Sequence, residues 1–369
     1  MGWFGFRWRP AAAGSALLVA MVAAGCGPQL RSPVLPDAAV EQERIKQQEL
    51  ALELFEQRFQ RLLNVSGRLR VRGADLCGEG TAPYFGVEWF SLEAFGEGFR
   101  SVAERRYGAG DTVRVFAVAA GSPAEAAGVR RGDVLVSVDG RPYSAPRQAL
   151  EWLASWKDAS LPLELRRDGR VRSVVLHGVR ACRYRVELVH SDDVNAFADG
   201  NRVGITTGMM RFVESDDELA LVVGHEIAHN VLGHVRRRQA NSLAGALLGA
   251  LLDIGAAAAG VDTGGAGTRM GMQAGGIAYA KEFEAEADYL GSYLAARAGF
   301  DIRGAPLLWR RMAVEHPSSI GHTFMASHPS TPERATALAR TVEEIEAKIA
   351  SGRPLVPERL AGEGSTAVR

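Results

Sequence analysis

The sequence lacks an excess of charge of either sign. Its 369 residues contain 43 lysines and arginines and 43 aspartates and glutamates, so the formal net charge is zero. A chain without net positive charge has no general attraction to nucleic acid or to an anionic membrane surface, and we expect no nucleic-acid partner. Hydrophobic residues make up 47% of the chain, which suffices for ordinary buried cores, and the length predicts two domains.

Long hydrophobic runs are scarce too, and the one at the N-terminus, residues 11–25, is too short to span a bilayer comfortably. It follows Arg7 and Arg9, which is the pattern of a signal peptide over residues 1–26. The run ends in AAGC, which resembles a bacterial lipobox and implies that Cys26 is lipidated and anchors the protein to a membrane that it does not span. A plain secretory signal, or an N-terminal helix that is not removed, is the alternative.

Residues 27–82 are expected to form a spacer followed by an amphipathic helix. Apolar side chains recur there at helical spacing and form one stripe, at Ile45, Leu52, Phe55, Phe59 and Leu62. The polar face mixes charges of both signs, which argues against a membrane-surface helix. We therefore expect the stripe to pack on the domain formed by residues 184–350.

Residues 83–178 show short strand patterns separated by turns. Their central part, residues 111–143, has a strand, a Ser-Pro-Ala turn, a short helix and the sequence GDVLVSVDG, and it resembles the core of a PDZ domain. Residues 145–156 fit the helix that borders the peptide groove of such a domain. A segment upstream resembles its carboxylate-binding loop and consists of Tyr84, Phe85, Gly86 and Val87. The resemblance implies a domain that binds a peptide as an added strand.

Only three cysteines are present, and Cys77 and Cys182 flank the PDZ-like segment once Cys26 is assigned to lipidation. The ends of a PDZ domain lie close together, so the resemblance implies that these two thiols can meet. In an oxidising compartment we expect a disulfide between them. Two free buried thiols are the alternative.

The sequence GHEIAHNVLGH, from residue 224 to residue 234, follows a helix start at Ser215 or Asp216. Within a helix, His225 and His229 are four residues apart and project from one face, so their ring nitrogens can bind one metal ion. Glu226 lies beside them. This pattern in a helix is typical of a metallopeptidase, although it also occurs by chance.

A catalytic zinc site needs a third protein ligand. His234 is five residues beyond His229 and is expected to point away from the site. The better candidate is Glu284, which shares a helix face with Asp288 four residues later. In gluzincin metallopeptidases, which this pair resembles, the aspartate fixes a ligating histidine through its second nitrogen. Glu282 and Glu286 are expected to face elsewhere, as solvated charges.

Five segments together resemble the HtpX, BepA and Oma-type zinc metallopeptidases, relatives of the CaaX prenyl protease. They are NAFADG from residue 195, HEIAHNVLGH from 225, EFEAEADYLG from 282, AGFD from 298 and SHPSTPER from 327. The resemblance implies one Zn²⁺ per chain, bound by His225, His229 and Glu284, with Glu226 as general base. It also implies an α+β fold: a mainly helical zincin-like domain with a small β-sheet over residues 184–350, and an inserted β-rich PDZ domain.

The same resemblance assigns residues that would contact the substrate. A strand that would pair with the backbone of a polypeptide substrate comprises Asn195, Ala196, Phe197 and Ala198. His328 and Arg334 would lie near the metal, where either side chain can stabilise the oxyanion of the transition state. His328 can instead occupy the open zinc position and latch the enzyme, or simply pack before the proline that follows it.

Two further segments have a distinctive composition. Residues 241–276 are apolar and rich in small residues, but Asp253 interrupts them, so we expect a packed helical hairpin or a lid rather than a transmembrane helix. Residues 351–369 are polar and contain proline and glycine, and we expect a mobile tail.

These features predict a zinc endopeptidase that hydrolyses envelope or misfolded periplasmic proteins and selects them through its PDZ domain. Gly27 stands where an aspartate would retain a lipoprotein at the inner membrane, so the periplasmic face of a bacterial outer membrane is the expected location. The alternative is a latched or inactive metalloprotein that acts as a PDZ-based binding or assembly factor.

Overall fold

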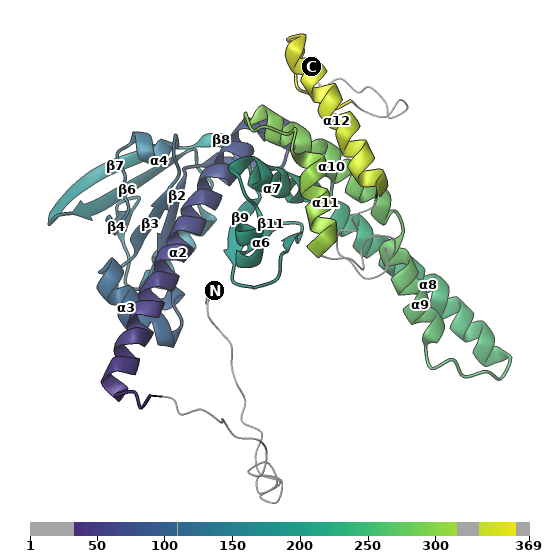
Figure 1. Ribbon diagram of the computed structural model, residues 1–369, viewed down its shortest axis with the longest axis horizontal. Helices are drawn as coiled ribbons and strands as arrows, with labels where there is room; N and C mark the ends of the chain where they lie inside the picture. Colours follow the sequence, from purple (N-terminus) through teal and green to yellow (C-terminus); the bar gives the residue numbers. More distant parts are fainter. Residues whose placement is uncertain (1–32, 109, 316–331, 359–369) are drawn as a thin grey trace, which may run out of the picture.

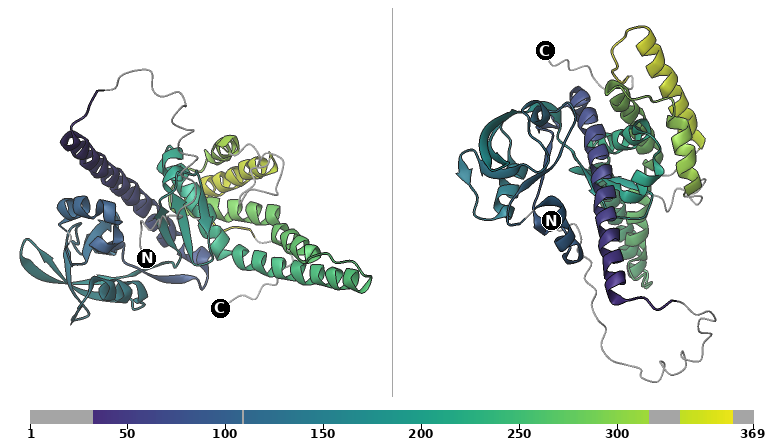
Figure 2. Two further views of the ribbon diagram at one scale, coloured as in Figure 1. Left: turned by 90° about the horizontal axis from the view of Figure 1, so that it is seen from below. Right: turned by 60° about the vertical axis from the view of Figure 1, so that its left-hand side comes forward.

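A computed structural model describes residues 33–108, 110–315 and 332–358 (Figure 1). The fold is α+β. A long helix, α2 (Asp37–Arg72), runs between a β-rich module and a mainly helical domain, and a helical hairpin projects from the side opposite the β-rich module (Figures 1 and 2). Cys26 and His328 lie outside the described residues.

Helix α2 holds the two parts together. Its buried side is formed by Leu52, Glu56, Phe59, Leu62, Leu63, Val65, Ser66, Gly67 and Leu69. The Glu56 carboxylate accepts a hydrogen bond from Arg106 in the β-rich module (Nε–Oε1, 2.8 Å), whereas Arg61 pairs with Asp216 at the start of a helix of the other domain (2.7 Å). The expected contact with the catalytic domain is present, but the same helix also packs on the β-rich module.

The β-rich module is built on an antiparallel sheet with the strand order β2-β3-β4-β6-β7, to which β5 adds beside β4. The strands are β2 (Val87–Phe90), β3 (Arg114–Val118), β4 (Val134–Val138), β5 (Arg141–Pro142), β6 (Ser160–Arg167) and β7 (Arg170–His177). The helices are η2 (Leu92–Ala94), α3 (Glu97–Tyr107), α4 (Pro123–Ala126) and α5 (Pro146–Ser155). The expected groove helix is α5, whereas α3 was not anticipated.

The module has its own core, separate from that of the helical domain. Its buried residues are Val113, Val115, Ala124, Val129, Leu135, Val138, Ala149, Leu161, Leu163, Leu165, Val174 and Leu176. Along β6 the buried residues alternate with more exposed ones, as expected of a strand with one face on a core. The strands β6 and β7 pair from Ser160 and His177 to Arg167 and Arg170, around a turn at Asp168 and Gly169.

The chain enters and leaves this module through a narrow neck. Strand β1 (Thr81–Tyr84) pairs antiparallel with β8 (Val179–Cys182). Just before β1, the short helix η1 (Ala74–Cys77) ends at the first cysteine, and Cys77 and Cys182 form a disulfide with their Cα atoms 5.7 Å apart. The neck is therefore closed both by strand pairing and by a covalent bond.

The helical domain starts from a three-stranded sheet with the order β10-β11-β9. Its strands are β9 (Arg185–Val189), β10 (Ala196–Ala198) and β11 (Arg202–Thr206). The helices that follow are α6 (Thr207–Phe212), α7 (Asp216–Val231), α10 (Ala280–Arg297), α11 (Ala305–Glu315) and α12 (Pro332–Ala350). The Thr206 hydroxyl accepts a hydrogen bond from the Met209 amide and starts α6 directly after β11.

Helices α8 (His234–Ala258) and α9 (Ala266–Ile277) form a hairpin over residues 241–276, one of the two arrangements expected there. Part of the expected mobile tail is fixed on the helical domain: the Lys348 ammonium donates to the Val356 carbonyl (2.9 Å), and the Glu358 amide donates to the Tyr289 hydroxyl (3.0 Å). The rest of that tail, residues 359–369, lies outside the described residues.

Candidate metal centre

Helix α7 carries the two histidines of the motif. The Ser215 hydroxyl accepts a hydrogen bond from the Glu218 amide and so caps the start of the helix. Three acidic residues in the first turn interact favourably with the positive end of the helix dipole. His225, Glu226 and His229 are all buried on this helix. Their position between the sheet and α10 depends on small residues, because a Cβ atom added to Gly291 of α10 would lie 2.7 Å from the His225 amide nitrogen.

Glu284 of α10 lies opposite the two histidines. The Nε2 atoms of His225 and His229 are 3.0 Å apart, and each lies 3.4 Å from one oxygen of the Glu284 carboxylate. Two donors bound at about 2.0–2.1 Å to a tetrahedral ion lie roughly 3.3–3.4 Å apart. Two imidazoles and one carboxylate also form a donor set that suits zinc. The residues present therefore fit a zinc ion.

Asp288 and Arg334 support these ligands from behind. Asp288 Oδ1 lies 2.9 Å from His225 Nδ1, the ring nitrogen that faces away from Glu284. The buried Arg334 guanidinium donates to both oxygens of Asp288 (2.8 Å each) and lies 2.9 Å from Glu284 Oε2. Arg334 thus links a candidate ligand to the carboxylate that orients another, and its guanidinium packs over the Trp309 ring at 4.7 Å.

His234 contradicts the expectation that it points away from the site. It is buried, its Nδ1 lies 2.9 Å from His229 Nδ1, and its Nε2 lies 2.9 Å from a carboxylate oxygen of Glu286. The helical period does not continue from His229 to His234, because Gly233 adopts a left-handed conformation (φ 69°) between α7 and α8. Glu286 was expected to be a solvated charge, but the turn at Gly233 brings His234 against it, so this expectation is wrong as well.

The electrostatics of the cluster favour cation binding. Burial lowers the pKa of His225, but its hydrogen bonds to Asp288 and Glu284 outweigh burial and raise that pKa to about 10. Burial lowers the pKa of His229, and it lowers the pKa of His234 to about 4. Burial raises the pKa of Asp288, but the charge of Arg334 outweighs this effect and lowers it. Metal binding at His225 Nε2 therefore competes with a proton.

The strand expected to bind substrate lies at the edge of the small sheet, next to α7. Asn195 precedes β10, which comprises Ala196, Phe197 and Ala198 and pairs on one side with β11. Asn230, the residue after His229, accepts a hydrogen bond from the Gly200 amide and donates one to the Arg202 carbonyl. These two bonds attach the hairpin of β10 and β11 to the helix that carries the candidate metal ligands.

The expected carboxylate-binding loop connects β1 to β2 in the β-rich module. Gly86 has a φ of 73°, and a Cβ atom there would lie 2.1 Å from the Ser122 Cβ, so glycine is required. Val87 and Trp89 of β2 and Leu150 and Leu153 of α5 are half-buried at the border of the module core. Strand β2 is the outer strand of its sheet, an arrangement that can accept a peptide strand.

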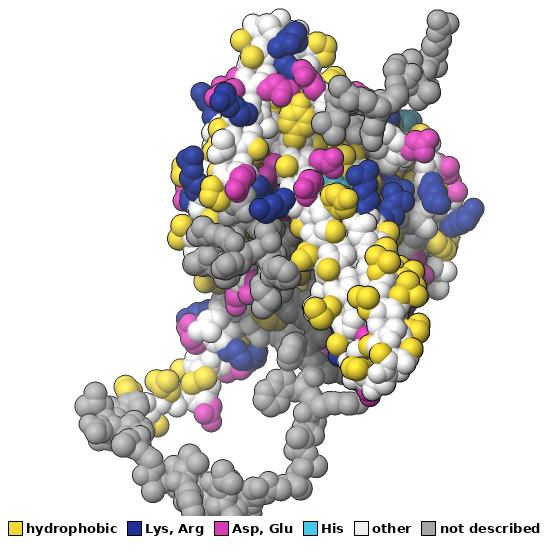
Figure 3. All heavy atoms as spheres, turned by 90° about the vertical axis from the view of Figure 1, so that its right-hand side faces the viewer, with side chains coloured by type: hydrophobic (Ala, Val, Ile, Leu, Met, Phe, Trp, Pro, Cys, Tyr) yellow, Lys and Arg dark blue, Asp and Glu magenta, His cyan; other side chains and the backbone are white. Residues whose placement is uncertain are grey.

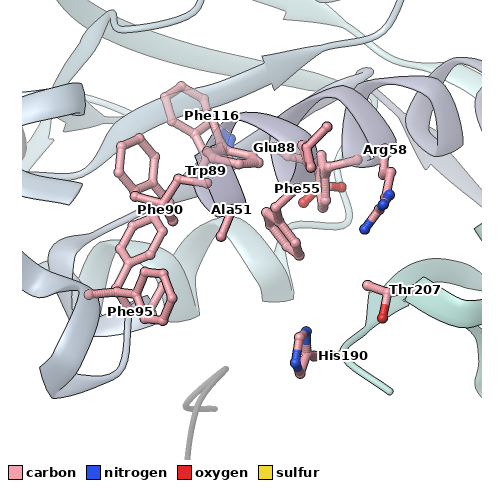
Figure 4. Close-up of a pocket in the computed structure, with 15 residues that line it drawn as sticks. Ala51, Phe55, Arg58, Glu88, Trp89, Phe90, Phe95, Phe116, His190 and Thr207 are labelled. Carbon is pink, nitrogen blue, oxygen red and sulfur yellow. The ribbon is translucent and has the colours of Figure 1, made fainter. Parts of the chain in front are cut away.

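An apolar cavity of about 330 Å³ lies where α2, the β-rich module and the helical domain meet. Figure 4 shows Phe55 and Arg58 of α2, Phe90 of β2, and His190 and Thr207 from the helical domain around it. No sequence pattern indicated this cavity, because its lining comes from three separate segments. Trp309, which packs against the His225 ring at 5.0 Å, was likewise missed, since one tryptophan in a helix indicates only a core residue.

Comparisons with known proteins match the part of the chain that contains these residues. Residues 166–342 match the family model of Peptidase family M48, and residues 114–167 match that of the PDZ domain. Over 176 residues the chain is 28% identical to the mitochondrial metalloendopeptidase OMA1 of Arabidopsis thaliana, covering 47% of this chain and 35% of that protein. Over 161 residues it is 32% identical to the beta-barrel assembly-enhancing protease of Escherichia coli, covering 42% and 33%.

A further match, the putative beta-barrel assembly-enhancing protease of Vibrio cholerae, is 34% identical over 158 residues, covering 40% of this chain and 32% of that protein. The chain thus spans about a third of the length of these curated relatives. The HtrA3 PDZ domain with a phage-derived ligand is 20% identical and covers 27% of this chain and 88% of that one, with a TM-score of 0.22. From the family matches and these homologues, the chain contains a peptidase family M48 domain together with a PDZ domain.

Proposed function

We propose that this protein is a zinc metalloendopeptidase that hydrolyses polypeptides. The observation that carries the proposal is the convergence of His225, His229 and Glu284 from two helices, with the buried Glu226 next to the first histidine. The homologues are named as metalloendopeptidases and proteases, which supports the same reaction. A zinc ion held here supplies Lewis acidity and lowers the pKa of water toward about 7.

The side chains of the site transfer protons, orient the ligands and stabilise charge. Glu226 accepts a proton from the attacking water and returns it to the departing amine. Asp288 holds the His225 ring so that Nε2 faces the metal, and His234 does the same for His229. Arg334 fixes Glu284 and Asp288, and from this position its charge also favours an oxyanion in the site. His328 keeps its three alternatives: transition-state stabilisation, a latch, or packing.

Two edge strands, β10 and β2, can bind a polypeptide substrate by strand pairing. Strand β10 can pair with an extended backbone and so present the scissile bond to α7, while β2 can receive a chain end as an added strand beside α5. The PDZ groove would then select exposed C-terminal segments, which are typical of misfolded envelope proteins. Lipidation of Cys26 would retain the enzyme at the periplasmic face of the outer membrane.

The test is cleavage of an unfolded substrate such as casein by the purified protein and by Glu226→Gln. The variant should bind zinc as the unchanged chain does, about one ion per chain, and lose cleavage. Glu282→Gln is the matched control, because Glu282 is exposed on the same helix as Glu284, and it should retain activity. If the unchanged chain binds zinc but does not cleave, even after His328→Ala, the proposal fails in favour of an inactive metalloprotein that acts as a binding factor.

A further inference from the structure

The hairpin of α8 and α9 exposes an unusual amount of apolar surface. Among the described residues, α8 is the one helix long and apolar enough to cross a membrane, yet only 6% of its most apolar window is buried. Figure 3 shows hydrophobic side chains over much of the projecting hairpin. A core helix would be mostly buried, and a signal sequence would lie at the N-terminus, so neither explains α8.

The apolar side chains of α8 lie on the side away from α9. Small residues make the contact between the helices: a Cβ atom on Gly245 would lie 2.0 Å from the Gly271 carbonyl oxygen, and one on Gly249 would lie 2.0 Å from that of Gly267. Residues two positions from these glycines therefore face outward, and Leu248 and Leu252, three positions away, lie on the flank of the same apolar surface. The large exposed ones are Leu243, Leu247, Leu248, Leu251, Leu252 and Ile254, and we call them the leucine face.

The polar groups of the hairpin are placed where they do not interrupt this face. Asp253 points between the helices, where its carboxylate accepts hydrogen bonds from Thr263, Gly267 and Thr268. On α9, Arg269 and Gln273 are exposed, and their spacing from Gly267 and Gly271 places them on the side away from α8. The leucine face of α8 is therefore uninterrupted, whereas the outer side of α9 carries Arg269 and Gln273 together with the exposed Met270 and Met272.

We propose that the leucine face lies on a lipid bilayer, in the plane of the interface. An interfacial helix has an apolar face wide enough to enter the acyl boundary and cationic groups that meet the phosphates. Leu247 and Leu252 are 70% and 71% exposed, and Arg236, Arg237 and Arg238 follow one another at the base of α8. The positive charge of these arginines complements anionic headgroups. A second copy of the chain would bring the same basic segment and would repel it.

This contact would set the height of the metal centre above the membrane. His234 is the first residue of α8 and touches His229, while α9 is followed directly by α10, which carries Glu284. Both ends of the hairpin are thus attached to helices of the metal site. The inference concerns a surface remote from the reaction and does not depend on the proposed peptidase activity.

The experiment uses the full chain, reconstituted into vesicles of phosphatidylethanolamine and phosphatidylglycerol, with an environment-sensitive fluorophore on Leu251→Cys. The emission should shift to the blue, and spin-labelled lipids should quench it. The same label on Leu307→Cys, in α11, is the matched control, because Leu307 is 57% exposed outside the hairpin, and it should show neither effect. Adding Leu247→Gln and Leu252→Gln to the hairpin label should abolish both effects while the circular dichroism stays unchanged.

Two results would overturn the proposal. A label at residue 251 that keeps its aqueous spectrum in vesicles shows that the leucine face stays in water. A blue shift that grows with the density of protein and resists quenching by lipid shows instead that the face packs on a second copy of the chain.

Discussion

Replacement of His234 tests how the metal centre is held. If His229 binds zinc through Nε2, its Nδ1 carries the proton, and His234 Nδ1, 2.9 Å away, must accept it. The other nitrogen of His234 then donates to Glu286, 2.9 Å away. His225 has a direct carboxylate partner in Asp288, whereas His229 reaches its carboxylate through a second imidazole.

The size of the effect follows from this geometry. Loss of the partner of a ligating histidine costs about 10–100-fold in metal affinity, which is about 1.4–2.7 kcal/mol. We expect this loss for His234→Leu, which keeps the volume but removes the acceptor. His234→Asn can place its amide oxygen near the former Nδ1, so it should recover much of the affinity. Glu286→Gln should cost less than about tenfold, because Glu286 is partly exposed and its charge is screened.

The assay is competition for zinc with a chromophoric chelator, with each substitution placed in Glu226→Gln so that no chain is cleaved. His177→Asn is the control, because His177 is exposed on β7, in the β-rich module. Equal zinc affinity in His234→Leu, His234→Asn and the parent chain would refute the reasoning. A loss that is the same for leucine and asparagine would show that His234 acts only through packing.

Three further predictions concern stability and helix packing. Reduction of the Cys77–Cys182 disulfide, which spans 105 residues, should lower the free energy of unfolding, measured by urea denaturation, by about 4–5 kcal/mol. A loss below about 1 kcal/mol would mean that the β-rich module stays folded in the urea-unfolded state of the chain. Glu56→Gln should cost about 1–3 kcal/mol near neutral pH. Burial raises the pKa of Glu56, but the hydrogen bonds from Arg106 and Arg131 outweigh burial and lower that pKa below its ordinary value of 4.5. The stabilisation by Glu56 is therefore present above pH 4.5 and disappears as the pH falls through the lowered pKa. An equal loss of stability in Glu56→Gln at acid pH would contradict this reasoning. Gly291→Ala should force α10 away from α7 and reduce zinc affinity by more than about tenfold. The control is Gly98→Ala in α3, where a Cβ atom meets open space, and it should stabilise the protein by up to about 1 kcal/mol. Unchanged zinc affinity in Gly291→Ala would contradict the close packing of the two helices.

The sequence predicts those parts of the site that depend on the period of a single helix. His225 and His229 share a face, and so do Glu284 and Asp288, because four residues make about one turn. The place of His234 could not be predicted, since the left-handed Gly233 changes the direction of the chain before it. Arg334 and Trp309 come from helices whose position is set by tertiary packing. The resemblance therefore predicts that Arg334 lies near the metal but not what it touches, and nothing in the sequence indicates Trp309.

The closed neck has a consequence for the way such chains can vary. Residues 77 and 182 lie 5.7 Å apart at their Cα atoms, a distance that a short turn can bridge. The segment between them can be excised or exchanged for another recognition unit without moving the ends of the peptidase scaffold. A fusion of that kind would retain the candidate metal centre and acquire a different peptide-binding module.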